Sequence, residues 1–329
     1  MSKEIKNCIV IGCGTWGVNH VDFLSSQKRL KGIFDIDKKK TLYVSKQYKC
    51  KAYKNYKQIL NDEEVENIFI TNTAKNHFKT FNFLSKSKKN FFIEKPICLK
   101  FSELKKMKKI IKKNKIKFSS GHLLLYHSCF IQMIKLIKNN SIGKILSIKA
   151  LRQNFGKFRH EEDVITSLMP HDISMIFKIL NNNKNKKIKA KILNLKFLLN
   201  VFDESRLFVK FNKINILVSV SWVSYNKRHE FVVLGDRGML IFNDTNPDIN
   251  KKLELIKFDY TSKDNKIFPN IRSKEYVQYE SDKRPLQEEL KYTLDYFDSK
   301  ITNVINNFDE AYDVMSFLFK VKNKNIKLD

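Results

Sequence analysis

A glycine-rich motif directly after a short apolar run is the feature that most constrains this chain. The run Cys8-Ile-Val-Ile leads into Gly12-Cys-Gly-Thr-Trp-Gly17, which has the spacing G-x-G-x-x-G. In such a turn Gly12 permits the tight bend, Gly14 lets the backbone approach a pyrophosphate, and Gly17 lets the next helix pack closely on the strand. The pyrophosphate then lies on free N–H groups at the helix N-terminus. The motif predicts a dinucleotide-binding turn, and a glycine turn without a ligand is the alternative.

An acidic residue follows at the spacing that a dinucleotide site requires. Asp35 ends the second expected strand, 21 residues after Gly14. A carboxylate at this position hydrogen-bonds the ribose hydroxyls and repels a 2′-phosphate, which favours NAD over NADP. The lysines at positions 38–40 follow closely and are able to bind a phosphate. NADP therefore remains the second choice of cofactor.

The first 120 residues alternate short apolar runs with segments whose apolar residues recur at helical spacing. Strands are expected over residues 7–11, 30–34, 67–71, 90–94 and 116–120, and helices over 18–26, 77–86 and 101–113. Strands that alternate with helices form a parallel sheet with helices on both faces. The sequence therefore predicts an α/β protein whose N-terminal domain, residues 1–122, is a doubly wound Rossmann sheet that binds NAD(P).

Successive strand-like runs replace this alternation in the second half of the chain. They cover residues 144–155, 189–197, 206–211, 214–223, 231–234 and 239–242. Several alternate with period 2 and are joined by short turns, which predicts a large, mostly antiparallel open sheet. Helices are expected over 127–138, 170–180, 286–298 and 309–321, and a loop over 181–187. We expect a C-terminal α+β domain over residues 123–329, with its last helix packed back on the first domain.

Length and composition exclude several classes of protein. A chain of 329 residues with 42% hydrophobic residues fits two domains with real cores, not a disordered polymer. No apolar run approaches the roughly 18–20 residues of a membrane helix. The first apolar run is too short for the core of a signal peptide, so we expect a cytoplasmic protein. The five cysteines are scattered and odd in number, which argues against a disulfide framework or a zinc site.

The formal net charge of +29 makes nucleic-acid binding an alternative. Only 8 of the 63 basic residues are Arg, the residue that most often reads bases. The lysines are spread along the chain, and Asn, Ile and Phe are abundant too, which is typical of an AT-rich coding sequence. We therefore expect no nucleic-acid partner, although a positive field would favour an anionic substrate.

Lys95 and His171 are the candidate catalytic residues. Glu94-Lys95-Pro96 ends an expected parallel strand, at the sheet edge where ligands bind. A Lys95 ammonium there would favour the alkoxide that precedes loss of a hydride, and a surface lysine is the alternative. His171, after Pro170 at an expected helix start or kink, would accept the hydroxyl proton unless it is a structural histidine. Asp172 would orient His171 or cap the helix.

Further histidines lie near the same expected strand ends. His122 and Tyr126 follow the last strand of the parallel sheet and either line the cleft or pack in the core. His77 begins a helix, and a position facing the cofactor is one of two open choices. The seven histidines lack metal-binding spacing, so we predict no metal site. Cys13 has no base near it in the sequence, and we expect it to be inert.

In this order, these pieces resemble the Gfo/Idh/MocA oxidoreductase family along nearly the whole chain. The likeness is carried by the glycine motif, Asp35, Ile70-Thr-Asn-Thr-Ala-Lys-Asn-His77, Glu94-Lys95-Pro96, Leu234-Gly-Asp-Arg-Gly238 and Pro285-Leu-Gln-Glu-Glu289. The resemblance implies a catalytic Lys95, a cis Lys95–Pro96 peptide and a Glu94 that helps to hold the nicotinamide ribose. It implies cofactor contacts from Gly12, Gly14, Thr15, Trp16, Gly17, Asp35, Thr71, Asn72, His77, Glu94 and Lys95.

One position departs from the family pattern D-x-x-x-H at the start of the catalytic helix. His171 fits the histidine, but Ser167 stands four residues earlier, where the family has Asp. Asp163 lies eight residues before His171. The departure puts the proton relay in question and makes Asp172 a substitute candidate.

Residues 121–127 and 156–174 resemble a subgroup similar to the UDP-N-acetylglucosamine and UDP-N-acetylglucosaminuronate 3-dehydrogenases. Arg152, Arg159 and Lys157 would suit a diphosphate or a carboxylate. Substrate contacts are expected from His122, Tyr126, Arg152, Arg159, His171 and Asp172.

This resemblance implies an NAD-dependent dehydrogenase that oxidises a ring hydroxyl, at C3, of a nucleotide-linked amino sugar for surface polysaccharides. It also implies a second domain that binds substrate and forms a homodimer or homotetramer. The alternatives are a dehydrogenase of a free sugar or polyol, such as inositol or glucose, and an NAD-bound sensor or scaffold without turnover.

Overall fold

The computed structural model describes residues 7–156, 158–180, 188–198, 200–263, 265–322 and 324. They form two compact units. One holds the residues up to Leu123 together with Leu286–Ser316, and the other holds Leu124–Pro285 and the residues from Phe317 on. Three sequence predictions fall outside the described residues, namely the interpretation of the first six residues, the loop over 181–187 and the role of Lys157.

A six-stranded parallel sheet forms the centre of the first unit and confirms the predicted Rossmann fold. Its order is β3-β2-β1-β4-β5-β6. The strands are β1 (Asn7–Ile11), β2 (Leu30–Phe34), β3 (Lys51–Ala52), β4 (Val65–Ile70), β5 (Asn90–Ile93) and β6 (Phe118–Ser120). The strand order reverses beside β1, because β2 lies on one side of it and β4 on the other. The glycine turn after β1 therefore lies at the switch point, where such sheets bind ligands.

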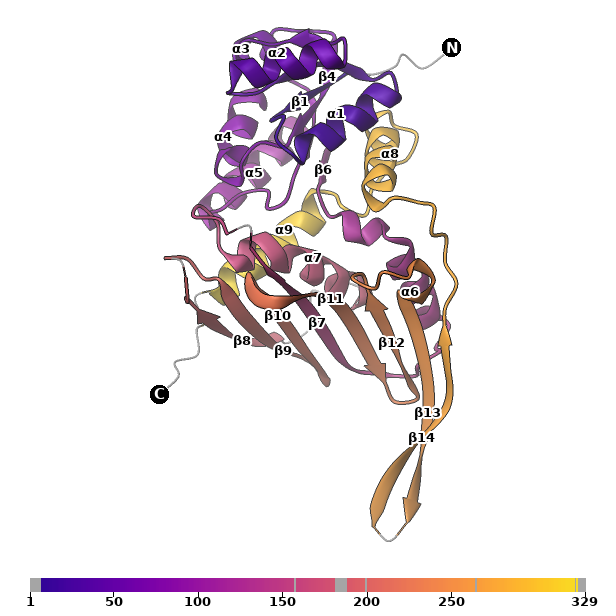
Figure 1. Ribbon diagram of the computed structural model, residues 1–329. Coiled ribbons are helices and arrows are strands. Elements are labelled where there is room, and N and C mark those ends of the chain that lie inside the picture. The colour runs from indigo at the N-terminus through magenta and orange to yellow at the C-terminus, as the bar shows by residue number, and fades with distance from the viewer. Residues whose placement is uncertain are drawn as a thin grey trace. The chain divides into compact units, whose positions relative to one another are not determined.

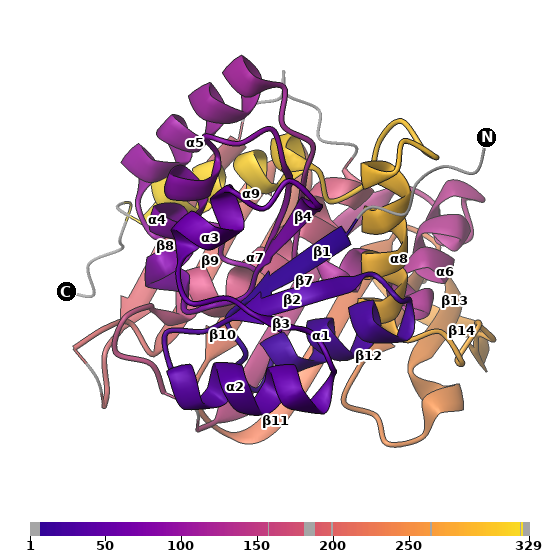
Figure 2. The ribbon, with the colours of Figure 1, turned by 90° about the horizontal axis from the view of Figure 1, so that it is seen from above.

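Helices cover both faces of this sheet (Figure 2). On one face α1 (Gly17–Ser26), α2 (Lys38–Gln47) and α8 (Pro285–Phe297) share a core with β1, β4 and β5; their buried side chains are Val21, Leu24, Val44, Leu290, Leu294 and Phe297. On the other face lies α4 (Ala74–Leu84), with α5 (Phe101–Asn114) beside it. There Phe81 of α4 meets the rings of Phe91 and Phe118 edge-on. The short helix α3 (Tyr56–Leu60) joins β3 to β4.

Helix α8 belongs to the first unit although it follows the second-unit strands in the chain. Its C-terminal end is held by Lys117, whose Nζ donates to Tyr296 O (2.7 Å) and Ser299 Oγ (2.6 Å). Arg29 adds a two-pronged ion pair with Asp298, with N–O distances of 3.0 and 2.9 Å. A lysine at helix-terminal carbonyls complements the negative end of the helix dipole. These contacts hold α8 to the N-terminal unit, which also contains the first part of α9 (Phe308–Lys322).

An eight-stranded sheet forms the second unit, in the order β14-β13-β12-β11-β7-β10-β9-β8. The strands are β7 (Ile145–Phe155), β8 (Ile188–Leu195), β9 (Glu204–Phe211), β10 (Ile214–Ser221), β11 (Val223–Gly235), β12 (Gly238–Asn243), β13 (Leu253–Lys263) and β14 (Lys266–Tyr276). Only the β7–β10 pair is parallel among the named strands. The predicted mostly antiparallel sheet is confirmed.

Helices α6 (Ser128–Lys138) and α7 (Val164–Ile179) pack on one face of this sheet (Figure 1). Two short 3₁₀ helices, η1 (Leu123–Tyr126) and η2 (Ile249–Lys251), lie outside these longer elements. The strands alternate accordingly; in β9 buried and exposed residues follow one another from Ser205 to Phe211. The hairpin β13–β14 extends beyond the ends of its neighbours. Sequence analysis left β13 and β14 unassigned because most of β14 is exposed and Pro269 interrupts its pattern.

Helix α7 starts earlier than predicted. Pro170 lies inside the helix and not at its start. Asp163 is the N-cap, and its side chain accepts from Thr166 N at 2.9 Å. A proline inside a helix costs about 3 kcal/mol, but burial of Val164, Ile165 and Met169 in the preceding turns offsets that cost. The prediction that the helix begins at residue 170 was therefore wrong.

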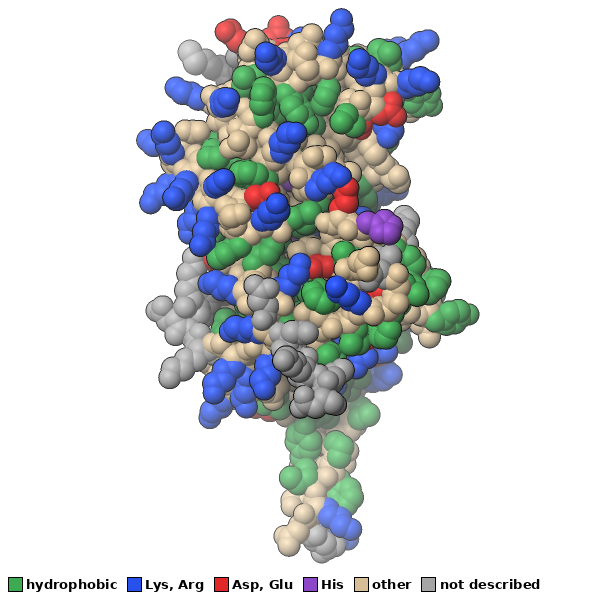
Figure 3. All heavy atoms as spheres, turned by 90° about the vertical axis from the view of Figure 1, so that its left-hand side faces the viewer, with side chains coloured by type: hydrophobic (Ala, Val, Ile, Leu, Met, Phe, Trp, Pro, Cys, Tyr) green, Lys and Arg blue, Asp and Glu red, His purple; other side chains and the backbone are tan. Residues whose placement is uncertain are grey.

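Basic side chains are distributed over the surfaces of both units. On the face that Figure 3 shows, Lys and Arg lie among hydrophobic and acidic side chains and do not form one continuous stripe. No helix in the described part of the chain is long and apolar enough to cross a lipid bilayer.

Candidate functional site

The glycine turn has the tight geometry that its sequence predicts. Gly12 has a φ of +100°, and a Cβ on it would overlap the backbone of Asn72. A Cβ on Gly17 would overlap the carbonyl oxygen of Gly12, so the start of α1 packs directly on the turn. A Cβ on Gly14, in contrast, would meet no atom within 4 Å. The backbone at Gly14 is therefore open to a ligand, while Gly12 and Gly17 are needed for the tight bend and the close packing of α1.

The start of helix α1 fits a bound pyrophosphate. Trp16 occupies the N-cap position without a side-chain cap, and the first turn holds no acidic residue. The N–H groups at such a helix start favour an anion. Beside the turn, the Asn72 side-chain oxygen is buried and lacks a hydrogen-bond partner within the described residues. The backbone at residues 14–17, including Thr15, thus fits a dinucleotide.

Asp35 is anchored to the same turn. One carboxylate oxygen accepts from Cys13 N at 2.7 Å, and the other accepts from Asp37 N at 3.0 Å. Cys13 lies inside the turn, and burial raises the pKa of its thiol to about 12, so the thiol stays protonated. The two amide bonds fix the direction of the Asp35 carboxylate at the end of β2.

The segment after β4 supports the turn from the other side. Thr71 Oγ1 donates to Gly12 O at 2.7 Å, and Asn72 Nδ2 donates to Thr80 Oγ1 at 3.0 Å. His77 is buried, with Nδ1 at 2.8 Å from Pro96 O and Nε2 at 2.9 Å from Asn72 O. His77 therefore links the ends of β4 and β5 through their backbones. Its two ring nitrogens are both engaged in these contacts.

Glu94 is the most strongly held side chain at this sheet edge. It is 5% exposed, and its Oε1 accepts from Trp16 Nε1 at 2.7 Å and lies 2.8 Å from His20 Nε2. Oε2 accepts from Lys95 N at 3.2 Å. Burial alone would raise the pKa of Glu94, but the hydrogen bonds from His20 and Trp16 and the charge of Lys95 outweigh burial and lower that pKa. Glu94 is thus a buried, ionised carboxylate.

Lys95 follows directly and is half-buried at the carboxyl end of β5. The Lys95–Pro96 peptide is cis, as the family resemblance implies. Because parallel strands end at one edge, the topology brings together Gly12 after β1, Asn72 after β4, Lys95 after β5 and His122 after β6. This edge holds most of the predicted cofactor residues.

His122 is enclosed at this edge. It is 2% exposed, and neither ring nitrogen has a hydrogen-bond partner in the described part of the chain. Burial lowers its pKa to about 4, so the ring is neutral. The preceding residue, Gly121, leaves room for Glu94, because a Cβ atom on Gly121 would overlap Glu94 Oε2. Tyr126, which falls in the second unit, is also buried, in η1.

Sequence reasoning missed two residues of this edge, His20 and Glu289. His20 is fully buried on α1, and its spacing to Gly17 and Leu24 is the helical period that marks a buried face. Glu289 is fully buried on α8, and its Oε1 accepts from Asn306 Nδ2 at 3.1 Å. An acid among Leu290 and Leu294 on a buried helix face was the signal available in the sequence.

The predicted substrate residues of the second unit form a separate cluster. Arg152 of β7 makes two hydrogen bonds to Asp172 of α7, from Nε to Oδ2 at 3.0 Å and from Nη2 to Oδ1 at 2.9 Å. Both side chains are buried. Asp172 lies in the middle of α7, so the prediction that it might cap the helix was wrong, and Asp163 holds that position. Arg152 already engages both carboxylate oxygens of Asp172.

His171, Ser167 and Arg159 belong to the same unit as this cluster. His171 lies on α7, and its carbonyl accepts from Ser174 Oγ at 2.8 Å. Ser167, which replaces the family's Asp, is buried on the same helix. Arg159 pairs with the buried carboxylate of Glu162, and half of its own side chain is exposed. Arg159 is therefore the more accessible of the two predicted arginines.

His229 is a further residue that the sequence did not reveal. It pairs with Arg152 across β11 and β7, so both side chains lie on the same face of the sheet. Burial, with the nearby Arg152 charge, lowers the pKa of His229 to about 4. Only strand register reveals this neighbour, because residues 152 and 229 lie far apart in the sequence. The described residues contain no group of three or more His, Cys, Asp or Glu placed to hold a metal ion.

Comparison with known proteins agrees with these observations. Residues 6–122 match the Gfo/Idh/MocA family, described as an oxidoreductase family with an NAD-binding Rossmann fold. The 2,7-anhydro-N-acetylneuraminate hydratase of Escherichia coli is 24% identical over 44% of this chain and 39% of its own length. The UDP-N-acetylglucosamine 3-dehydrogenase of Acidithiobacillus ferrooxidans is 25% identical over 50% of this chain and 51% of its own length. An inositol 2-dehydrogenase of Salmonella paratyphi B is 23% identical over 70% and 71%.

The matched segments cover about half or less of the first two relatives, but the fold likeness is more extensive. The solved structure of the A. ferrooxidans UDP-N-acetylglucosamine 3-dehydrogenase, GnnA, covers 97% of both chains with a TM-score of 0.79 at 16% identity. Both units therefore follow a known two-part architecture. With its glycine turn, its Glu94-Lys95-Pro96 strand end and its family match over residues 6–122, the N-terminal domain of this chain belongs to the NAD-binding Gfo/Idh/MocA oxidoreductases.

Proposed function

We propose that this protein is an NAD-dependent dehydrogenase that oxidises the C3 hydroxyl of a nucleotide-linked amino sugar to a keto sugar. The observation that carries the proposal is the placement of Lys95 beside the buried, ionised Glu94 at the ligand-binding edge of an NAD-type Rossmann sheet. The fold likeness to GnnA over 97% of both chains favours a nucleotide sugar. Bound NAD⁺ would supply the hydride acceptor.

Each candidate residue has a distinct task in this proposal. The Glu94 carboxylate would hold the nicotinamide ribose, and the Lys95 ammonium would stabilise the alkoxide form of the substrate hydroxyl. His171 of the second unit would accept the hydroxyl proton. Both carboxylate oxygens of Asp172 bond to Arg152, so this proposal assigns Asp172 to Arg152 and gives it no part in orienting His171. In this proposal the hydroxyl proton passes to His171 and from there to solvent.

The remaining predicted contacts divide by accessibility. Arg159, half-exposed beside Glu162, suits a diphosphate or carboxylate of the substrate. The unpartnered ring nitrogens of His122 suit a polar ligand atom, and Tyr126 stays a candidate contact. Asp35, fixed at the end of β2, would bind the adenosine ribose and favour NAD over NADP.

The first experiment follows absorbance at 340 nm with NAD⁺ and a panel of UDP-N-acetyl sugars, their uronates and free polyols. An aminotransferase that consumes keto sugars pulls an unfavourable oxidation forward. The proposal expects a rise with one UDP-sugar. A rise with a free polyol alone would support the second candidate, a polyol dehydrogenase, which the inositol 2-dehydrogenase match over 70% of this chain favours. NAD binding without any turnover would indicate a sensor or scaffold.

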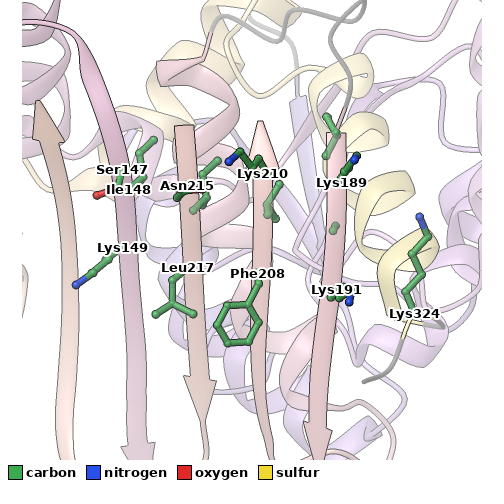
Figure 4. Close-up of a pocket in the computed structure, with 14 residues that line it drawn as sticks. Ser147, Ile148, Lys149, Lys189, Lys191, Phe208, Lys210, Asn215, Leu217 and Lys324 are labelled. Carbon is green, nitrogen blue, oxygen red and sulfur yellow. The ribbon is translucent and has the colours of Figure 1, made fainter. Parts of the chain in front are cut away.

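We also propose that the protein is a cytoplasmic homodimer or homotetramer joined through the open face of the eight-stranded sheet. Apolar side chains on this face are only half-buried, namely Leu151, Leu217, Val232, Ile241 and Ile256. A hollow of about 670 Å³ lies on it across β7, β10, β9 and β8. Figure 4 shows Leu217 and Phe208 on neighbouring strands between Lys149 and Lys191. Surfaces of this kind are often covered by a partner.

Light scattering coupled to size exclusion tests this assembly. The double variant Leu217→Lys/Val232→Lys places two charges in the proposed interface and is expected to be monomeric, while Leu42→Lys, at an exposed position on α2, is expected to keep the wild-type mass. A monomeric wild-type protein would refute the assembly. For the location in the cell, the five cysteines form no disulfide among the described residues, which suits a reducing compartment.

A further inference from the structure

Two buried carboxyl groups, Glu94 and Glu289, lie against one short segment of the first unit. A Cβ on Gly121 would overlap Glu94 Oε2. The backbone N–H of the next residue, His122, donates to Ser120 O at 2.8 Å, yet it lies close enough to Glu289 to oppose the rise in pKa that burial causes. Asn306 Nδ2 joins the same segment, because it donates both to Glu289 Oε1 at 3.1 Å and to Ser120 O at 2.6 Å. The two acids thus approach residues 120–122 from β5 and from α8.

The two carboxyl groups are not equally satisfied. Glu94 receives hydrogen bonds from Trp16, from the backbone of Lys95 and, in the appropriate tautomer, from His20. Glu289 has Asn306 on one oxygen, while its Oε2 is buried and has no hydrogen-bond partner within the described residues. The polar side chains that bond to this acid pair or act on its charge are Trp16 and His20 at the start of α1, Lys95 after β5, His122 after β6 and Asn306 before α9. Two of these groups can carry a positive charge beside Glu94, namely Lys95, which follows it in the chain, and His20 when its ring is protonated.

Two like charges in one buried space cannot both ionise at little cost. Burial and the Glu94 charge raise the pKa of Glu289 well above its usual value, whereas the pKa of Glu94 is lowered. His122 is neutral at pH 7 and does not compensate a second negative charge. The proton shared by this acid pair therefore resides on Glu289.

We propose that Glu289 holds a proton that is released to solvent when NAD⁺ binds and is kept when NADH binds. The two cofactor forms differ by one positive charge, which is on the nicotinamide ring. That ring belongs beside Glu94 in the proposed function, on whose cofactor site this inference rests. A cation next to the acid pair compensates the second carboxylate and favours its ionisation. Glu289 is thus a positioning residue that couples protonation to the redox state of the bound cofactor.

Linkage gives the size of the effect. Full release of one proton on binding makes the affinity rise about tenfold for each pH unit between the two pKa values of the group. The useful quantity is the ratio of Kd for NADH to Kd for NAD⁺, because pH effects on the phosphates and the adenosine ribose are common to both. For the wild-type protein we expect this ratio to rise with pH, by about threefold to tenfold per unit in its steepest range.

Isothermal titration with NAD⁺ and with NADH, at intervals between pH 6 and pH 9, tests this coupling. Glu289→Gln keeps the shape of the side chain but carries no titrating proton, so we expect its ratio to be flat across the range. Glu288→Gln, the neighbour on the same helix, is the matched control and should follow the wild-type curve. A flat ratio in the wild-type protein, or a Glu289→Gln curve that rises like the wild-type curve, would overturn the proposal.

Proton counting provides a readout that needs no variant, in case Glu289→Gln fails to fold. Titrations in two buffers of different ionisation enthalpy give the number of protons released. We expect more protons released with NAD⁺ than with NADH, and equal numbers would overturn the inference. Because these are binding measurements, they separate the two proposals. Absence of sugar oxidation with the expected linkage refutes the proposed reaction alone, whereas absence of binding by both nucleotides refutes the cofactor site and this inference together.

Discussion

The ligand edge of the parallel sheet and the Arg152 cluster of the antiparallel sheet place their polar residues by different rules. At the first, the chain order of strand ends decides which residues meet: Gly12, Asn72, Lys95 and His122 each follow a strand of one parallel sheet. In the second unit, Arg152 meets Asp172 from a helix and His229 across a strand pair. The contrast teaches that a ligand edge follows from local sequence, while a cluster on a sheet face needs the register.

The two regions also differ in what their carboxylates can still do. The Glu94 oxygen Oε2 accepts a hydrogen bond from the Lys95 backbone N–H at 3.2 Å and lies against Gly121, with no guanidinium on it. Asp172 has both oxygens bound by one guanidinium. We therefore expect the first region to respond to substitution through activity and cofactor affinity, and the second through stability.

Lys95→Ala carries the largest expected effect on this comparison. Loss of the ammonium at the carboxyl end of β5 should lower kcat about 10²–10⁴-fold, because it removes stabilisation of a developing alkoxide. NAD⁺ affinity, measured by calorimetry, should fall far less than kcat. Lys109→Ala, an exposed lysine on the following helix, is the control. Turnover of Lys95→Ala within a few-fold of the wild type would remove Lys95 from the mechanism.

Loss of the Arg152–Asp172 pair carries the second-largest expected effect. Removal of one partner leaves a buried charge uncompensated, so Arg152→Met or Asp172→Asn should lower the free energy of unfolding by about 3–5 kcal/mol. The double variant Arg152→Met/Asp172→Leu should recover most of that loss. Urea unfolding followed by circular dichroism measures both. If Arg152→Met keeps its stability and instead raises KM for the sugar, Arg152 acts on substrate and the contrast between the regions fails.

His20→Ala probes the first region at a residue that the sequence did not mark. It removes one of the two side-chain contacts at Glu94 Oε1, leaving Trp16. A hydrogen bond to a charged group contributes about 1.5–3 kcal/mol, so Kd for NAD⁺ should rise about tenfold, because the carboxylate that holds the nicotinamide ribose is then less firmly oriented. His127→Ala, in the second unit, is the control that should leave Kd unchanged. Unaltered NAD⁺ affinity in His20→Ala would show that Glu94 is held without it.

Sequence reasoning identified the residues of the first region because each lies directly after a strand. The period of apolar residues gave the strands, and the parallel arrangement placed their ends at one edge. His20 and Glu289 escaped because each lies within a helix, where a polar residue on a buried face needs its partner to be known. Glu289 meets Asn306 and residue His122 only after α8 returns to the first unit.

The second region resisted prediction for a different physical reason. Helix α7 extends through Pro170 because Asp163 caps it and its first turns are buried, a tertiary gain that local propensity does not register. The Arg152–Asp172 pair depends on how that helix lies on β7, and the Arg152–His229 neighbourhood depends on strand register. Both are set by packing, so residue types and spacing alone did not reveal that Asp172 pairs with Arg152.

Asp244→Asn carries the smallest expected effect and tests whether a second carboxylate of the second unit is structural too. Asp244 lies 3.6 Å from His127 Nε2 and 3.1 Å from Lys252 Nζ. Burial alone would raise the pKa of Asp244, but these partners outweigh burial and lower it strongly. A lowered pKa means that the ionised form contributes stability above the unfolded-state pKa of about 4, and that this contribution is lost as the pH falls toward the folded-state pKa.

We expect Asp244→Asn to lower the free energy of unfolding by about 1–2 kcal/mol at pH 7. The difference in the free energy of unfolding between wild type and variant, measured by urea unfolding, should stay constant down to about pH 5 and shrink below it. Kd for NAD⁺ should stay unchanged. A gap that persists undiminished at pH 3, or a weakened NAD⁺ affinity, would place Asp244 with Glu94 and not with Asp172.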